Sequence, residues 1–111
     1  MARDQAYYEA EKKIEKARRS RTTELYLNSM ELTELPEAVG QLTQLQSLDL
    51  FDNQLTALPE SLSNLKQLEI LRLKINQLTT LPTSFITLQN LRKLVLGDGK
   101  GGNPLNQLPL C

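Results

Sequence analysis

The chain has 111 residues, with thirteen basic and thirteen acidic side chains, one cysteine, and neither histidine nor tryptophan. This length suits a single domain, and the balanced charge argues against a protein that coats nucleic acid through many phosphate contacts. Without histidine the chain lacks the usual general base and the commonest zinc ligand, and one cysteine cannot form an intrachain disulfide. We therefore expect no catalytic residue, no metal site and no cofactor.

Targeting signals are missing from the sequence. The first residues contain no apolar segment typical of a secretory signal, and no stretch approaches the ~18 apolar residues that span a bilayer. Cys111 is the last residue, whereas a prenylated cysteine is followed by three more residues. We expect a cytoplasmic protein that binds neither membranes nor nucleic acid.

Residues 1–21 differ from the rest of the chain. They hold seven basic residues, four acidic residues and no leucine, whereas residues 22–111 hold six basic residues, nine acidic residues and all twenty-four leucines. Asp4 is a suitable N-cap, and good helix formers follow it as far as Arg19. Apolar residues recur at helical spacing at Tyr7, Ala10, Ile14 and Ala17. The pattern predicts an amphipathic helix over residues 4–19 that caps the remainder of the chain.

Residues 22–111 repeat with a period of 23 residues. Leucine columns at this spacing begin at Leu25, Leu27, Leu32 and Leu35, and further columns are Pro36, Pro59 and Pro82, then Val39, Leu62 and Phe85, then Asn53 and Asn76. The alternation L-x-L predicts a short strand with one buried face, and the Leu-Pro pair ends the extended segment because proline has a fixed φ and no N–H donor. One repeat cannot bury its own leucines, so we expect the repeats to stack and their strands to form a parallel sheet.

The asparagine column has a structural explanation. An asparagine that points inward at the bend can satisfy backbone polar groups of its own repeat and of the neighbouring repeat. Asn53 and Asn76 are therefore predicted to stabilise the stack rather than to bind a ligand.

These motifs resemble the leucine-rich repeat, in its bacterial and intracellular class with 23-residue units, over about four-fifths of the chain. The resemblance implies a right-handed α/β solenoid of about four coils, with a short parallel sheet on its concave face and a non-catalytic role in protein–protein recognition. The coils would be residues 22–44, 45–67, 68–90 and 91–111. The helix and first repeat are similar to the start of the repeat domains of Roco proteins, which are multidomain GTPases. The alternative function is therefore a repeat fragment of a larger signalling enzyme, a Roco-type GTPase or an effector ubiquitin ligase, without its catalytic domain.

The fourth coil departs from the pattern. Residues 99–102, from Gly99 to Gly102, form a four-residue insertion after the predicted strand, and they lack the spacing of a phosphate-binding loop. We expect a surface loop there. The chain ends halfway through a coil, and Leu105 and Leu108 would have no next coil to pack on. The sequence therefore predicts that the protein is either marginally stable or self-associates through an uncapped C-terminal end.

The alternation places one set of side chains outside the buried leucines, on the concave face. The predicted partner-binding residues are Tyr26, Asp49, Phe51, Ile70, Arg72, Lys74, Lys93 and Val95. Aromatic groups beside arginine are typical of interface anchors. Charge changes along this face from acidic to basic, and Asp49 and Arg72 are placed to pair across adjacent strands. We expect a protein partner here, and the sequence does not reveal its identity.

Overall fold

The computed structural model describes residues 5–96. The predicted insertion at residues 99–102 therefore lies outside the described residues. So does the C-terminal end through which self-association was predicted. The elements in chain order are one α-helix, α1 (Gln5–Ser20), and then four short strands that alternate with three 3-10 helices: β1 (Glu24–Tyr26), η1 (Glu37–Gln41), β2 (Ser47–Asp49), η2 (Glu60–Asn64), β3 (Ile70–Arg72), η3 (Thr83–Thr87) and β4 (Lys93–Val95).

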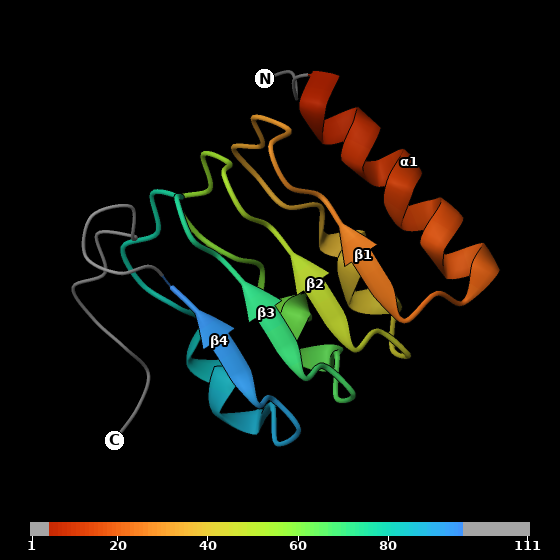
Figure 1. The fold of residues 1–111 in the computed structure, drawn as a ribbon, viewed down its shortest axis with the longest axis vertical. Coiled ribbons are helices and arrows are strands. Elements are labelled where there is room, and N and C mark those ends of the chain that lie inside the picture. Colours follow the sequence, from red (N-terminus) through yellow and green to blue (C-terminus); the bar gives the residue numbers. More distant parts are fainter. Residues whose placement is uncertain (1–4, 97–111) are drawn as a thin grey trace.

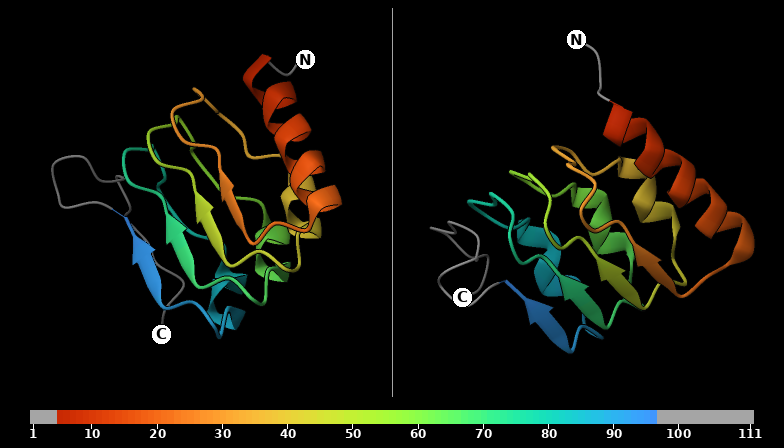
Figure 2. Two further views of the ribbon diagram at one scale, coloured as in Figure 1. Left: turned by 45° about the vertical axis from the view of Figure 1, so that its right-hand side comes forward. Right: turned by 45° about the horizontal axis from the view of Figure 1, so that its top comes forward.

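The four strands form a parallel sheet in the order β1-β2-β3-β4. Each strand pairs with the next at an offset of 23 residues, so that Leu25, Leu48, Leu71 and Leu94 align across the sheet. The 3-10 helices form a second layer behind the strands (Figures 1 and 2). The period in the sequence is therefore the step from one strand to its neighbour.

The Leu-Pro pairs explain where the return segments begin. These segments are the stretches containing η1, η2 and η3 that lead from one strand back to the start of the next. Pro36, Pro59 and Pro82 immediately precede η1, η2 and η3, and their φ values of −58°, −70° and −58° are those that the proline ring imposes. Each 3-10 helix has only five residues. The return layer is thus built from single short helices, which is typical of a unit too short for an α-helix of several turns.

Leucine side chains fill the space between the two layers. Leucines from the strands, the turns and the return segments are almost completely buried, together with Val39 and Phe85 from the 3-10 helices. Leu94 differs, since it is 38% exposed although its column is otherwise buried. Its strand, β4, has a neighbouring strand on only one side within residues 5–96. A leucine in a strand of this sheet is therefore fully buried only when another element packs on each side of its repeat.

Asn53 and Asn76 have the structural role predicted from the sequence. Asn53 is buried; its Oδ1 accepts hydrogen bonds from the N–H groups of Met30 and Leu32, and its Nδ2 donates to the carbonyls of Leu27 and Leu50. All four distances are 3.0 Å. Asn76 repeats the arrangement one unit later, with bonds to Leu55 N and to the carbonyls of Leu50 and Leu73. Each asparagine thus joins two adjacent units.

Helix α1 packs on the first unit. It begins at Gln5 among the described residues and ends at Ser20, one residue beyond the predicted end. The predicted stripe of Tyr7, Ala10, Ile14 and Ala17 is its buried face, and the last three belong to the common core. Arg21 follows in the left-handed conformation with a φ of 54°, and Thr22 N donates to Ala17 O. This geometry is a common way to end a helix. None of the helices among residues 5–96 is both long and apolar enough to cross a membrane.

A glycine allows η1 and η2 to approach closely. A Cβ atom at Gly40 would lie 2.6 Å from the backbone oxygen of Ser61 and 2.8 Å from its Cβ. We expect Gly40→Ala to lower the free energy of unfolding by about 2 kcal/mol, because backbone atoms must shift to relieve the overlap. Urea denaturation measures this, with Gln41→Ala, an exposed neighbour, as the control expected to change stability by less than about 0.5 kcal/mol. Equal effects of the two variants would contradict the close approach.

Candidate protein-binding face

The outward side chains of the four strands and of the residues just after them form one continuous surface, which we call the strand face. It consists of Glu24, Tyr26, Asn28, Ser47, Asp49, Phe51, Ile70, Arg72, Lys74, Lys93 and Val95. All eight residues predicted to bind a partner lie on it. Their positions follow from strand geometry, because the residues between them point into the core.

The register arranges the strand face in rows. Tyr26, Asp49, Arg72 and Val95 align across the sheet as predicted, and Glu24, Ser47, Ile70 and Lys93 form the row beside them. In each of the first three strands the residue between the two rows is a buried leucine. The rows are therefore held on a packed scaffold, which fixes the backbone beneath each outward side chain.

Exposure varies along the rows. Tyr26 is 52% exposed, and Lys93 is also exposed. Phe51, Ile70 and Val95 are half-buried, so each keeps part of its apolar surface accessible. A face of this kind combines aromatic, aliphatic and charged groups, which is the composition of protein interfaces.

Hydrogen bonds order the acidic half of the strand face. The Tyr26 hydroxyl donates to Glu24 Oε1 at 2.9 Å, and this bond together with the charge of the carboxylate raises the pKa of Tyr26. Asp49 Oδ1 accepts from the backbone N–H of Phe51 at 3.0 Å. The predicted pairing of Asp49 with Arg72 is wrong, since the two form no ion pair among the described residues. The carboxylate of Asp49 instead holds the turn that follows its own strand.

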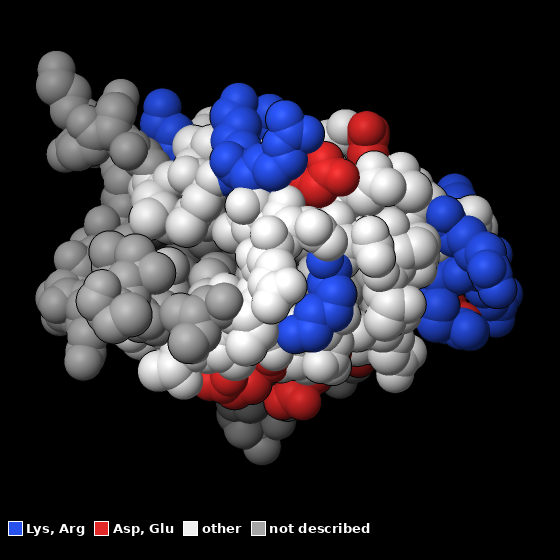
Figure 3. All heavy atoms as spheres, turned by 90° about the horizontal axis from the view of Figure 1, so that it is seen from below, with Lys and Arg blue, Asp and Glu red and all other residues white. Residues whose placement is uncertain are grey.

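Charge is divided along the strand face. Glu24 and Asp49 lie on β1 and β2, whereas Arg72 and Lys93 lie on β3 and β4, and Lys74 follows β3. Figure 3 shows a group of Lys and Arg along the upper edge of the molecule beside acidic side chains, and a separate cationic group at the α1 end on the right. The β3–β4 half of the strand face thus carries three cations and no carboxylate.

Sequence reasoning missed a feature at the turns after β1, β2 and β3. Ser29, Asp52 and Ile75 occupy equivalent positions, 23 residues apart, and all adopt the left-handed conformation with φ values of 55°, 62° and 60°. Ser29 Oγ donates to Asp52 Oδ2 at 3.0 Å. Polar residues such as aspartate adopt this conformation readily, but a β-branched residue in it is an outlier. Ile75 is also 39% exposed. The sequence carried one signal of this, an isoleucine in a column that is otherwise polar.

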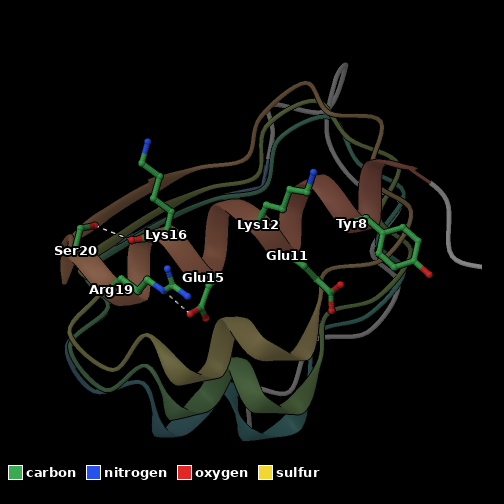
Figure 4. A pocket seen from close by; sticks show the side chains of 7 residues that line it. All are labelled: Tyr8, Glu11, Lys12, Glu15, Lys16, Arg19 and Ser20. Carbon is green, nitrogen blue, oxygen red and sulfur yellow. Dashed lines mark hydrogen bonds and ion pairs between the residues drawn. The ribbon is translucent and has the colours of Figure 1, made fainter.

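A shallow surface depression lies on the outer side of α1. It is open to solvent, and all its lining residues come from the helix (Figure 4): Tyr8, Glu11, Lys12, Glu15, Lys16, Arg19 and Ser20. Glu15 accepts hydrogen bonds from Arg18 at 2.6 Å and Arg19 at 2.9 Å, and these bonds lower its pKa to about 2. The carboxylate of Glu15 therefore neutralises part of the positive charge of Arg18 and Arg19. Within residues 5–96, no three acidic or cysteine side chains converge on a position that could hold a metal ion.

The comparisons with known proteins agree with this architecture. Residues 13–106 match a family model described as a leucine-rich repeat region. A leucine-rich repeat protein of Leptospira interrogans is 40% identical in sequence and has a TM-score of 0.62, over 71% of this chain and 19% of that protein's chain. The present chain thus spans about a fifth of the length of that relative. No curated protein matches it.

Proposed function

The chain belongs to the leucine-rich repeat family, and from this premise we propose that it is a non-catalytic interaction module that binds a protein partner on the strand face. The observation that supports this function is the row of Tyr26, Asp49, Arg72 and Val95, aligned on neighbouring strands with an aromatic group and an arginine directed outward. Leucine-rich repeat domains are commonly protein-interaction modules.

The strand face suits binding because its scaffold is rigid. The backbone of each strand is hydrogen-bonded to its neighbours, and the leucines between the outward residues are buried in β1, β2 and β3. A surface that is ordered before binding loses less conformational entropy when the partner docks. Phe51 and Arg72 are the best anchors, since aromatic and arginine side chains contribute most to interfaces.

Site-specific photo-crosslinking tests the proposed function. The photoreactive residue p-benzoylphenylalanine replaces Phe51 in one sample and Gln67, an exposed residue that precedes the strand face in its unit, in the control sample. A partner that crosslinks at position 51 and not at position 67 is then purified and titrated against the wild-type protein.

We expect the double variant Phe51→Ala, Arg72→Ala to bind this partner at least about thirtyfold more weakly, a loss of about 2 kcal/mol or more, if both act as anchors. Titration calorimetry measures the affinity, and circular dichroism verifies that the fold is retained. The matched control is Glu11→Ala, Lys12→Ala on the outer side of α1, which should leave the affinity unchanged. Unchanged affinity of the strand-face variant would overturn the proposed function.

The proposal includes the handedness of the repeats, the number of coils and the division of the chain into cap and repeats. We infer a right-handed solenoid of about four coils, with residues 1–21 as a cap and residues 22–111 as repeats, in a cytoplasmic protein. The parallel sheet, the 23-residue register and the packing of α1 on the first unit support it. The resemblance to Roco proteins and the alternative of a larger signalling enzyme stay predictions, and the coding sequence downstream of Cys111 tests them through the presence or absence of a GTPase or ligase domain.

A further inference from the structure

The β3–β4 half of the strand face combines positive charge with apolar surface, and Ile75, whose backbone is strained, directly follows Lys74. We propose that this half, together with Ile75, binds an acidic segment of the partner protein. Carboxylates of that segment contact Arg72 and Lys93, and one of its apolar side chains contacts Ile75. The inference rests on the proposed function, because it specifies the chemistry of the partner that the strand face binds.

The β3–β4 half of the strand face is positively charged. The side chains of Arg72 and Lys93 make no ion pair or hydrogen bond with other residues between 5 and 96, and Lys74 adds a third positive charge next to them. The acidic groups of the strand face lie on β1 and β2, and Asp49 is engaged with the Phe51 N–H. Glu69, at the start of the third unit, is 3.8 Å from Arg92. A cationic surface with this arrangement attracts carboxylates and repels basic segments.

The spacing of the cations fits an extended peptide. Lys93 aligns with Ile70, two residues before Arg72 on the neighbouring strand. Strands lie about 4.8 Å apart and rise about 3.3 Å per residue, which puts the backbone positions of Arg72 and Lys93 about 8 Å from each other. In an extended segment, the backbone positions of residues i and i+2 are about 7 Å apart. Acidic residues at positions i and i+2 can therefore reach both cations.

Ile75 is an exposed apolar residue with a strained backbone. It lies directly after Lys74, in the left-handed conformation at a φ of 60°, and it is 39% exposed. The equivalent positions hold Ser29 and Asp52, which suit that backbone better than a β-branched residue does. An exposed isoleucine here gives up stability without filling the core. Strain of this kind is concentrated at functional positions, and an apolar contact with the partner accounts for it.

Selection from a random dodecapeptide display library tests the proposal. Peptides are selected on the wild-type protein, synthesised, and titrated by fluorescence anisotropy. We expect the selected peptides to be enriched in Asp and Glu at alternating positions, together with an apolar residue. The double variant Arg72→Glu, Lys93→Glu should weaken their binding at least about tenfold. Lys12→Glu, Lys16→Glu makes the same change of charge on α1 and should alter the affinity less than about twofold.

The variant Ile75→Asn gives a readout that does not depend on charge. Asparagine tolerates the left-handed backbone, so the melting temperature should rise by about 3 to 6 °C, while peptide affinity falls about threefold or more. Glu31→Asn is the matched control, since Glu31 also has a positive φ, of 59°, but lies in the first unit. It should not weaken binding. A lower melting temperature for Ile75→Asn would contradict the strain argument.

The outcomes separate this inference from the proposed function. Neutral or basic peptides that lose affinity in Phe51→Ala would overturn the acidic-segment proposal and leave binding on the strand face intact. Peptides insensitive to every strand-face variant would overturn both. A selection that enriches no acidic peptide contradicts the present inference, whereas crosslinking at position 51 continues to test the proposed function.

Discussion

Asn53→Ala is expected to lower the free energy of unfolding by about 4 kcal/mol. The side chain of Asn53 makes four hydrogen bonds to the backbone of two adjacent units, each of 3.0 Å. Alanine removes all four, and the buried N–H of Leu32 and the carbonyl of Leu27 then lose their side-chain partner. An unsatisfied buried polar group costs about 1 to 3 kcal/mol. The carbonyl of Leu50 is less affected, because it also accepts a bond from Asn76.

Chemical denaturation at equilibrium measures the loss, and Asn28→Ala is the matched control. Asn28 is exposed on the strand face, and its replacement should change stability by less than about 0.5 kcal/mol. Asn76→Ala should behave like Asn53→Ala, since its side chain makes three bonds of the same kind. A loss below about 1 kcal/mol for Asn53→Ala would show that water replaces the side chain and that the asparagine column does not hold the units together.

The repeat period made much of this fold predictable from the sequence. Alternation within each unit predicted the strands, and the 23-residue spacing predicted the row from Tyr26 to Val95 that the register confirms. The asparagine column followed from the need to satisfy backbone groups at a bend. These features are local, or they recur in every unit, and a single sequence therefore displays them several times over.

Features that depend on one particular contact were not predictable. The overlap that any side chain at Gly40 would have with Ser61 results from the distance between η1 and η2, which no local pattern encodes. Asp49 is aligned with Arg72 in the register, but its carboxylate accepts a hydrogen bond from the nearby N–H of Phe51 and forms no ion pair with Arg72 among the described residues. The left-handed backbone at Ile75 was signalled only by the contrast between isoleucine and the polar residues of its column, because isoleucine itself rarely adopts that conformation.

Helix α1 lies outside the repeats and packs on the first of them. Ile14→Ala is expected to lower the free energy of unfolding by about 3 kcal/mol, as removal of a buried isoleucine side chain implies. Ile14 is 2% exposed and joins the same core as the leucines of the first unit. Stability in a stacked repeat protein depends on contacts between neighbours, so loss of packing at α1 should loosen the first unit before the others.

Two measurements test this view of α1. Urea melts give the change in stability, with the exposed Lys13→Ala as a control that should alter it by less than about 0.5 kcal/mol. Amide hydrogen exchange then locates the loss, and we expect protection to fall more in β1 than in β3. If Ile14→Ala were tolerated as well as Lys13→Ala, α1 would be an appendage that the repeats do not need. If protection fell equally in every strand, the helix and the repeats would unfold as a single cooperative unit. Removal of α1 would then unfold all the repeats.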